Sequence, residues 1–169
     1  TESFPTAEDV SPAPISPYAL SKLIGERYCK FYSEIYGIST IALRYFNVYG
    51  SRVNPKSSYR SVLPLFIDQF SKGLPLTITN DGNQARDFVY VGDVVAANLA
   101  AMRATGVGQP INIGFGESLS VNEIAQMIGG STQNIGPRLE PKLSLASIER
   151  ADKELGWRPT VNVRDWIKD

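Results

Sequence analysis

The chain has 169 residues, 43% of them hydrophobic and 20% charged, with 17 basic residues balanced by 17 acidic ones, so we expect a globular domain without the basic surface that attracts nucleic acid or an anionic membrane. No apolar run reaches the roughly 18 residues of a membrane span, no secretory leader opens the sequence, and the single cysteine, Cys29, fits a reducing cytoplasm. With no histidine and one cysteine, the sequence excludes Ser-His and Cys-His catalytic machinery and the usual zinc ligand sets.

The first strong pattern is a helix over residues 17–36 that follows a proline-rich segment. Four prolines within residues 1–17 favour an extended backbone there. Ser16 is a typical N-cap, and Pro17 takes the first helical position, where a missing N–H costs nothing. Gly37 is a natural C-cap. We therefore predict a helix with these two residues at its boundaries.

Short strands and helices alternate over the rest of the chain. The pattern predicts a strand at 38–46, a loop at 47–61, a helix at 62–73 ended by Gly73, a strand at 74–79, a turn at 80–87 and a strand at 88–91. It then predicts an alanine-rich helix from Asp93 to 105, a strand at 110–114, a helix at 121–128 capped by Ser120, a short strand at 142–146, a helix at 147–156 closed by Gly156, and a helix beginning within 161–169. This alternation predicts an α/β architecture.

Tyr18 and Lys22 are the first candidate catalytic residues. They are four positions apart in the predicted helix, so they lie on one face, one turn from each other. A free phenol is a poor base at neutral pH, but a nearby cation favours the phenolate. Such a pair could take a proton from a sugar or alcohol hydroxyl. A packed tyrosine beside a snorkelling lysine gives the same spacing without catalysis.

Several motifs in order resemble one enzyme family. The segments "SPYALSK", "LRYFNVYG", "RDFVYVGDVV" and "ADKELGWRP" are similar to those of the extended short-chain dehydrogenase/reductase family. Within it, the chain looks most like NAD-dependent nucleotide-sugar 4-epimerases, which act on UDP-hexoses or their N-acetyl forms. The resemblance covers nearly the whole chain and implies a Rossmann-type α/β fold.

The resemblance also implies roles for individual residues at the cofactor. Tyr18 would be the base, and Lys22 would bind the nicotinamide ribose of NAD and favour the phenolate. Tyr45 would lie near the nicotinamide, although core packing explains an aromatic residue there equally well.

A second set of residues would bind the UDP-sugar. By resemblance, Asn47 bonds the phosphate or sugar, backbone groups near Val62 and Leu63 contact the ligand, and Leu76 and Thr77 contribute to the uracil pocket. Arg86 and Arg138 would pair with the diphosphate, because a guanidinium fork suits two phosphate oxygens. The alternatives are a loop-forming role for Asn47, and Lys142 in place of Arg138. Asp87 could orient Arg86 or cap a turn.

A dinucleotide-binding turn is missing from the sequence. Such a site needs a Gly-rich turn between a strand and a helix, and the one candidate, Gly114 and Gly116 at and just after the end of the predicted strand, lacks a third glycine. Since the family's catalytic Ser or Thr lies about two dozen residues before the tyrosine, it would also precede Thr1. We therefore expect the C-terminal half of a longer subunit, lacking an N-terminal nucleotide-binding half of roughly 100 residues or more.

These inferences predict an organisation and a function. Residues 1–50 would belong to the Rossmann-type core and 51–169 mostly to a substrate-binding region, with 86–113 partly returning to the core. The whole would be part of a cytoplasmic UDP-sugar 4-epimerase that dimerises through the helix at 17–36, with no metal and no activity in the isolated chain. The alternatives are a nucleotide-sugar 4,6-dehydratase or decarboxylase, or a non-catalytic UDP-sugar-binding fragment.

Overall fold

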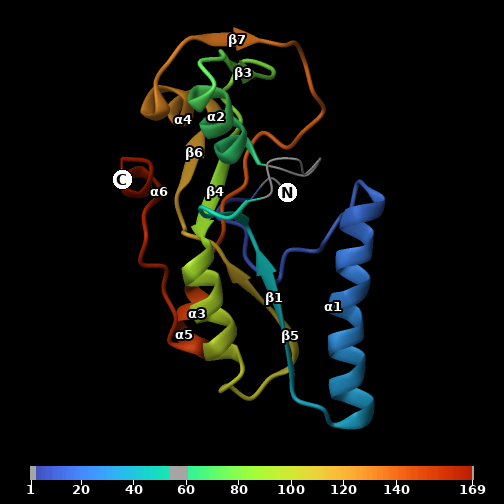
Figure 1. The fold of residues 1–169 in the computed structure, drawn as a ribbon. Helices are drawn as coiled ribbons and strands as arrows, with labels where there is room; N and C mark the ends of the chain where they lie inside the picture. The colour runs from blue at the N-terminus through green and yellow to red at the C-terminus, as the bar shows by residue number, and fades with distance from the viewer. Residues whose placement is uncertain (1–2, 54–60, 169) are drawn as a thin grey trace.

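The computed structural model describes residues 3–53 and 61–168. Its helices are α1 (Pro17–Tyr36), α2 (Val62–Ser71), α3 (Val91–Ala101), α4 (Val121–Ile128), α5 (Glu149–Leu155) and α6 (Val163–Trp166). Its strands are β1 (Thr40–Tyr45), β2 (Asn47–Tyr49), β3 (Leu76–Ile78), β4 (Ala85–Tyr90), β5 (Val107–Ile113), β6 (Ser118–Ser120) and β7 (Thr132–Asn134). The α/β architecture predicted from the sequence is confirmed (Figure 1).

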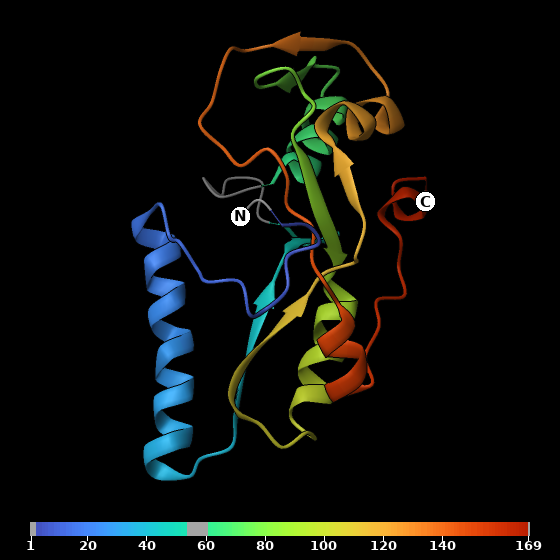
Figure 2. The ribbon, with the colours of Figure 1, turned by 180° about the vertical axis from the view of Figure 1, so that it is seen from behind.

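The strands form three small sheets. In the first, β1 and β5 pair in parallel, with Leu43 opposite Ile111. In the second, β4 lies between β2, which runs parallel to it, and β6, which runs antiparallel. The third pairs β3 with β7 in parallel. Because Phe46 alone connects β1 to β2, the first two sheets are joined end to end along the length of the molecule (Figures 1 and 2).

Two apolar clusters support these sheets. The first cluster packs α2, α4 and α6 around β3, β4 and β6, and its most buried side chains include Leu63, Phe66, Leu76 and Ile124. The second cluster packs α3 and α5 against β1 and β5, around Val89, Ala97, Ile111 and Ile113. The two clusters meet along β4, where Phe88 belongs to the first and Val89 to the second. Successive side chains of β4 point to opposite faces, so this one strand contributes to both clusters.

Helix α1 lies against the β1–β5 sheet on the side away from α3 and α5 (Figures 1 and 2). Both predicted boundaries are confirmed: the Ser16 hydroxyl accepts a hydrogen bond from the Ala19 N–H at 3.1 Å, and Gly37 takes a left-handed conformation with φ of 65°. No residue of α1 is fully buried. Although it has 20 residues, neither α1 nor any other helix in the described part of the chain combines the length and apolarity needed to cross a membrane.

Other boundaries predicted from the sequence were wrong. The expected loop at 47–61 contains β2, and the expected turn at 80–87 already contains the start of β4. Helix α3 begins at Val91, because the Asp93 carboxylate accepts hydrogen bonds from Thr160 and Val161 instead of capping its own helix. The expected strand at 142–146 is reduced to two isolated bridges, at Leu143 and Ala146.

Candidate active site

The structure brings Tyr18 and Lys22 together on the first two turns of α1. The Lys22 Nζ atom lies 5.1 Å from the centroid of the Tyr18 ring, a distance typical of a cation–π contact. The Tyr18 side chain is 58% exposed. The pair therefore presents an ammonium and a phenol to an open face of the helix.

Tyr45 ends β1 and lies outside both apolar clusters. Its side chain is half-exposed, and its hydroxyl donates a hydrogen bond of 2.9 Å to the Asn98 side-chain oxygen on α3. The core-packing alternative for Tyr45 is therefore wrong. Its predicted place beside a nicotinamide stays a prediction.

A cleft of about 370 Å³ lies between α2, β4 and the segment that follows β7. It gathers five of the residues predicted to bind substrate: Asn47, Val62, Thr77, Arg86 and Arg138. The sequence separates them by up to 91 positions, from 47 to 138, so the fold alone makes them neighbours.

Two of the predicted residues contribute differently. The side chains of Leu63 and Leu76 are fully buried in the first cluster. Strand β3 alternates, so that Leu76 and Ile78 face the core while Thr77 faces the cleft. Only the backbone of Leu63 or Leu76 remains for the ligand contacts predicted for them. Lys142, the alternative to Arg138, is not among the residues that line the cleft.

Arg86 carries a positive charge in the cleft, and this charge is paired. Its Nη2 atom lies 2.6 Å from Oε2 of Glu140, and the two side chains are 14% and 23% exposed. The other carboxylate oxygen of Glu140 accepts a hydrogen bond from the Thr79 hydroxyl at 2.9 Å. Sequence reasoning did not identify Glu140. Its only signal was an acidic residue two positions after Arg138, since its pairing with Arg86 spans 54 residues.

Asp87 follows Arg86 in β4 and binds the backbone of two neighbouring segments. It is fully buried, and its carboxylate accepts hydrogen bonds from the backbone N–H groups of Phe115, Gly116 and Ala146. Burial raises the pKa of this carboxyl above its ordinary value, against the opposing effect of these N–H donors. Its backbone carbonyl also accepts a hydrogen bond from the Asn47 side-chain amide at 3.0 Å. Of the two roles considered for Asp87, the structure shows the capping role, whereas Arg86 is oriented by Glu140.

Arg138 is held at the cleft by its backbone. Asn80 accepts a hydrogen bond from the Arg138 N–H at 2.9 Å and donates one to the Arg138 carbonyl at 3.1 Å. Asn80 itself takes a left-handed conformation with φ of 54°, which asparagine tolerates better than most residues. The Arg138 side chain therefore projects from a fixed point on the rim of the cleft.

The turn after β5 does not fit a dinucleotide pyrophosphate. A phosphate site needs free backbone N–H groups, but those of Phe115 and Gly116 are bonded to Asp87. An added Cβ on Gly114 would lie 2.6 Å from the Ala146 Cβ and 2.8 Å from an Asp87 oxygen, so this glycine makes room for these two side chains and not for a ligand. Tyr18, Lys22 and Tyr45 are exposed, and their contact with the nicotinamide end of NAD stays a prediction. Among the residues that the structure describes, no group of three or more His, Cys, Asp or Glu side chains is arranged to hold a metal ion.

The mostly parallel strand pairing, the Tyr-x-x-x-Lys helix and the arginine-containing cleft are typical of an extended short-chain dehydrogenase/reductase type of fold. Residues 1–114 match the family model described as "NAD dependent epimerase/dehydratase family". The chain belongs to this family, whose members use NAD.

Individual relatives agree with this assignment. The chain is 40% identical to a putative UDP-glucose 4-epimerase of Methanocaldococcus jannaschii, over 98% of this chain and 55% of that protein. The structure of this chain superposes on that of a Thermotoga maritima UDP-glucose 4-epimerase bound to UDP-glucose. The TM-score is 0.93 at 35% identity, and the match covers 99% of this chain and 56% of that one. A Thermus thermophilus UDP-glucose 4-epimerase in complex with NAD gives a TM-score of 0.82 at 34% identity, covering 93% and 53%. The chain thus spans about half the length of the relatives it matches.

Proposed function

We propose that this chain is the substrate-binding and base-carrying half of an NAD-dependent UDP-sugar 4-epimerase. The observation that carries the proposal is the single cleft in which Asn47, Val62, Thr77, Arg86 and Arg138 meet. Its volume of about 370 Å³ lies in the range of small-molecule sites. The similarity to epimerases, one of them bound to UDP-glucose, supports the same conclusion.

The cleft has the chemistry that a nucleoside diphosphate needs. Arg86 and Arg138 offer guanidinium groups to the phosphates. Apolar side chains of Val62, Leu65 and Phe88 line the same hollow and suit the face of a pyrimidine. The Asn47 amide already donates to the Asp87 carbonyl, and its oxygen offers an acceptor to a sugar hydroxyl.

The Tyr18–Lys22 pair would perform the proton transfer. Tyr18 would take the proton of the sugar 4-hydroxyl while the hydrogen on C4 leaves as a hydride. Lys22 would hold the nicotinamide ribose next to Tyr18. Bound NAD would supply reversible hydride-acceptor chemistry at C4, and Tyr18 would return its proton to the sugar 4-oxygen. The overall reaction is redox-neutral, so no second substrate is required.

We propose that the other half of the enzyme is supplied by a longer chain. Within the described residues β1 pairs with β5 alone, so its second edge can accept another strand of a larger parallel sheet. The exposed apolar residues of α1, among them Ile24, Tyr28 and Phe31, suit a subunit contact in a cytoplasmic homodimer. The isolated chain would bind UDP-sugars without converting them. Dehydration or decarboxylation of the same substrates stays the alternative reaction, since the family includes dehydratases.

Calorimetric titration of the chain with UDP and with uridine tests the cleft. We expect UDP to bind more tightly than uridine, and Arg86→Gln to weaken UDP binding about 10-fold or more through the loss of a charge-assisted contact. The double variant Arg86→Gln/Glu140→Gln removes both charges, so a loss there does not come from an unpaired Glu140. Arg103→Gln, at an exposed position beyond α3, is the matched control. Equal affinities for UDP and uridine, or unchanged UDP binding by both Arg86 variants, would disprove the assignment.

A further inference from the structure

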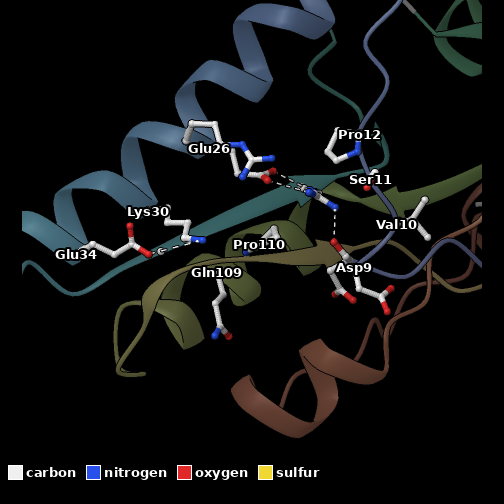
Figure 3. A pocket seen from close by; sticks show the side chains of 13 residues that line it. Asp9, Val10, Ser11, Pro12, Glu26, Lys30, Glu34, Gln109 and Pro110 are labelled. Atoms are coloured by element: carbon white, nitrogen blue, oxygen red, sulfur yellow. Dashed lines mark hydrogen bonds and ion pairs between the residues drawn. The ribbon is translucent and has the colours of Figure 1, made fainter.

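A second hollow, of about 430 Å³, lies between α1 and the sheet (Figure 3). Its walls come from the N-terminal segment 8–12, the middle of α1, and β1 and β5. Glu26 of α1 points across this hollow toward the sheet (Figure 3), where it meets Arg44 of β1. No step of the proposed reaction uses either residue.

The contact between Glu26 and Arg44 has two-point geometry. Arg44 Nε lies 2.8 Å from one carboxylate oxygen of Glu26, and Nη2 lies 2.8 Å from the other. The side chains of Arg44 and Glu26 are only 25% and 14% exposed. A partly shielded fork of this kind is stronger and more directional than an exposed ion pair.

The remaining guanidinium nitrogen extends the contact into the N-terminal segment. Arg44 Nη1 donates a hydrogen bond of 3.3 Å to the Glu8 carbonyl. Glu8 is itself buried, and its carboxylate accepts a hydrogen bond from the Asn112 N–H of β5 at 2.9 Å. The two-point contact of Glu26 with Arg44 is therefore also linked to the N-terminal segment, which is itself bonded to β5 of the same sheet.

Glu26 occupies the same stripe of α1 as the candidate catalytic pair. Tyr18, Lys22 and Glu26 follow one another at intervals of four residues, and each interval advances roughly 6 Å along the helix. Two further polar contacts attach α1 to β1, from the Thr40 hydroxyl to the Cys29 carbonyl and to the Ser33 hydroxyl. Of these contacts, the Glu26 fork is the one closest to Lys22.

We propose that Glu26 and Arg44 are positioning residues for the Tyr18–Lys22 pair. A helix without a fully buried residue has little core packing to fix its rotation about its own axis. The fork between Glu26 and Arg44 fixes this rotation one turn C-terminal to Lys22. It thereby sets the direction in which the phenol and the ammonium point. This inference rests on the proposed function, but it concerns residues that touch neither substrate nor cofactor.

The same helix provides a matched control. Lys30 and Glu34 form an ion pair of 3.6 Å with side chains 53% and 59% exposed, and both residues belong to α1. Glu34→Gln therefore makes the same chemical change as Glu26→Gln on the same helix, without breaking a contact to the sheet.

The kinetic test uses the longer enzyme that contains this chain, with rates normalised to folded, NAD-loaded subunits. We expect Glu26→Gln and Arg44→Lys each to lower kcat for UDP-galactose at least 10-fold, with KM changed less than twofold. Because the two residues act as one unit, Glu26→Gln/Arg44→Lys should be no slower than the slower single variant. Glu34→Gln should remain within twofold of the parent. Unchanged kcat, equal losses in Glu34→Gln, or additive losses in the double variant would overturn the proposal.

A structural test separates this inference from the proposed function. In the chain itself, Glu26→Gln should speed amide hydrogen exchange of residues 20–26 at least 10-fold, while Glu34→Gln should change it less than twofold. If the longer enzyme has no epimerase activity, the proposed function fails, and the exchange result still decides whether the fork holds α1. Equal exchange in the two variants would refute the positioning role.

Discussion

The cleft around Arg86 and the helix α1 are stabilised in different ways. The cleft stands on the first cluster, with fully buried Phe66 and Ile124, and on the buried carboxylate of Asp87. Helix α1 has no fully buried residue and exposes Ile24, Tyr28 and other large apolar side chains.

This difference concerns function as well as stability. In the cleft, Arg86 and Glu140 are already paired, and Asn47 is already bonded to the backbone of β4. On α1, the Tyr18–Lys22 pair lies on an open face. The candidate substrate cleft is thus formed entirely by residues of this chain, whereas the face of α1 that carries the candidate base is open.

The largest expected effect comes from the cleft. Asp87→Ala leaves the N–H groups of Phe115, Gly116 and Ala146 without their acceptor in a buried site. We expect a loss of roughly 3 kcal/mol or more in the free energy of unfolding, measured by urea denaturation. Asp165→Ala, at an exposed position of α6, should cost less than about 0.5 kcal/mol. A comparable small loss in Asp87→Ala would contradict the view that a buried carboxylate supports the cleft.

A smaller effect is expected where α1 meets β5. Gly108 has φ of 79°, and an added Cβ would lie 2.2 Å from the Lys30 Cα. Gly108→Ala should therefore push α1 from the sheet and cost about 1–3 kcal/mol, with faster hydrogen exchange in α1 and little change in β4. Gly25→Ala is the control, because nothing lies within 4 Å of its added Cβ, and it should be neutral or stabilise by up to about 1 kcal/mol. Equal exchange changes in α1 and β4 would show that the two regions are not independent.

The smallest effects compare two helix caps. Ser120 caps α4 in a capping box with Glu123, and Ser16 caps α1. Ser120→Ala should lower the free energy of unfolding by about 1 kcal/mol, because α4 unfolds only with the first cluster. Ser16→Ala should cost less in the global transition, because α1 can fray locally. A larger loss of unfolding free energy in Ser16→Ala than in Ser120→Ala, measured by urea denaturation, would contradict this difference between the two helices.

The same capping box predicts a pH dependence. Hydrogen bonds from Ser120 lower the pKa of the Glu123 carboxyl. Its contribution is therefore present above the pKa of the unfolded chain and is lost as the pH falls through the lower folded value. Glu123→Gln should remove this part of the acid dependence of stability.

Local signals made α1 predictable. Ser16, Pro17 and Gly37 mark its boundaries in sequence, and the structure uses Ser16 and Gly37 as caps. Strand β7 was missed because all three of its residues are exposed and polar, so no alternation marks it. The sequence placed the start of α3 at Asp93, which was wrong. The Asp93 carboxylate accepts its hydrogen bonds from Thr160 and Val161, which lie 67 and 68 residues away in the sequence.

The candidate site was predicted mainly through resemblance. Family motifs named Arg86 and Asn47, but no local pattern indicates that they share a cleft. The pairing of Arg86 with Glu140 depends on a contact across 54 residues, and the fork between Glu26 and Arg44 on one across 18. Contacts of this kind arise only when separate elements pack together.

The most direct test of the central claim measures conversion of UDP-galactose to UDP-glucose with added NAD. It compares the chain alone with the chain fused behind the nucleotide-binding half of a relative. We expect turnover only in the fusion, and a loss of about 10²-fold or more in Tyr18→Phe, because a general base is removed. Turnover by the chain alone, well above its own Tyr18→Phe variant, would contradict the claim that this chain supplies the cleft and the base but not a complete active site.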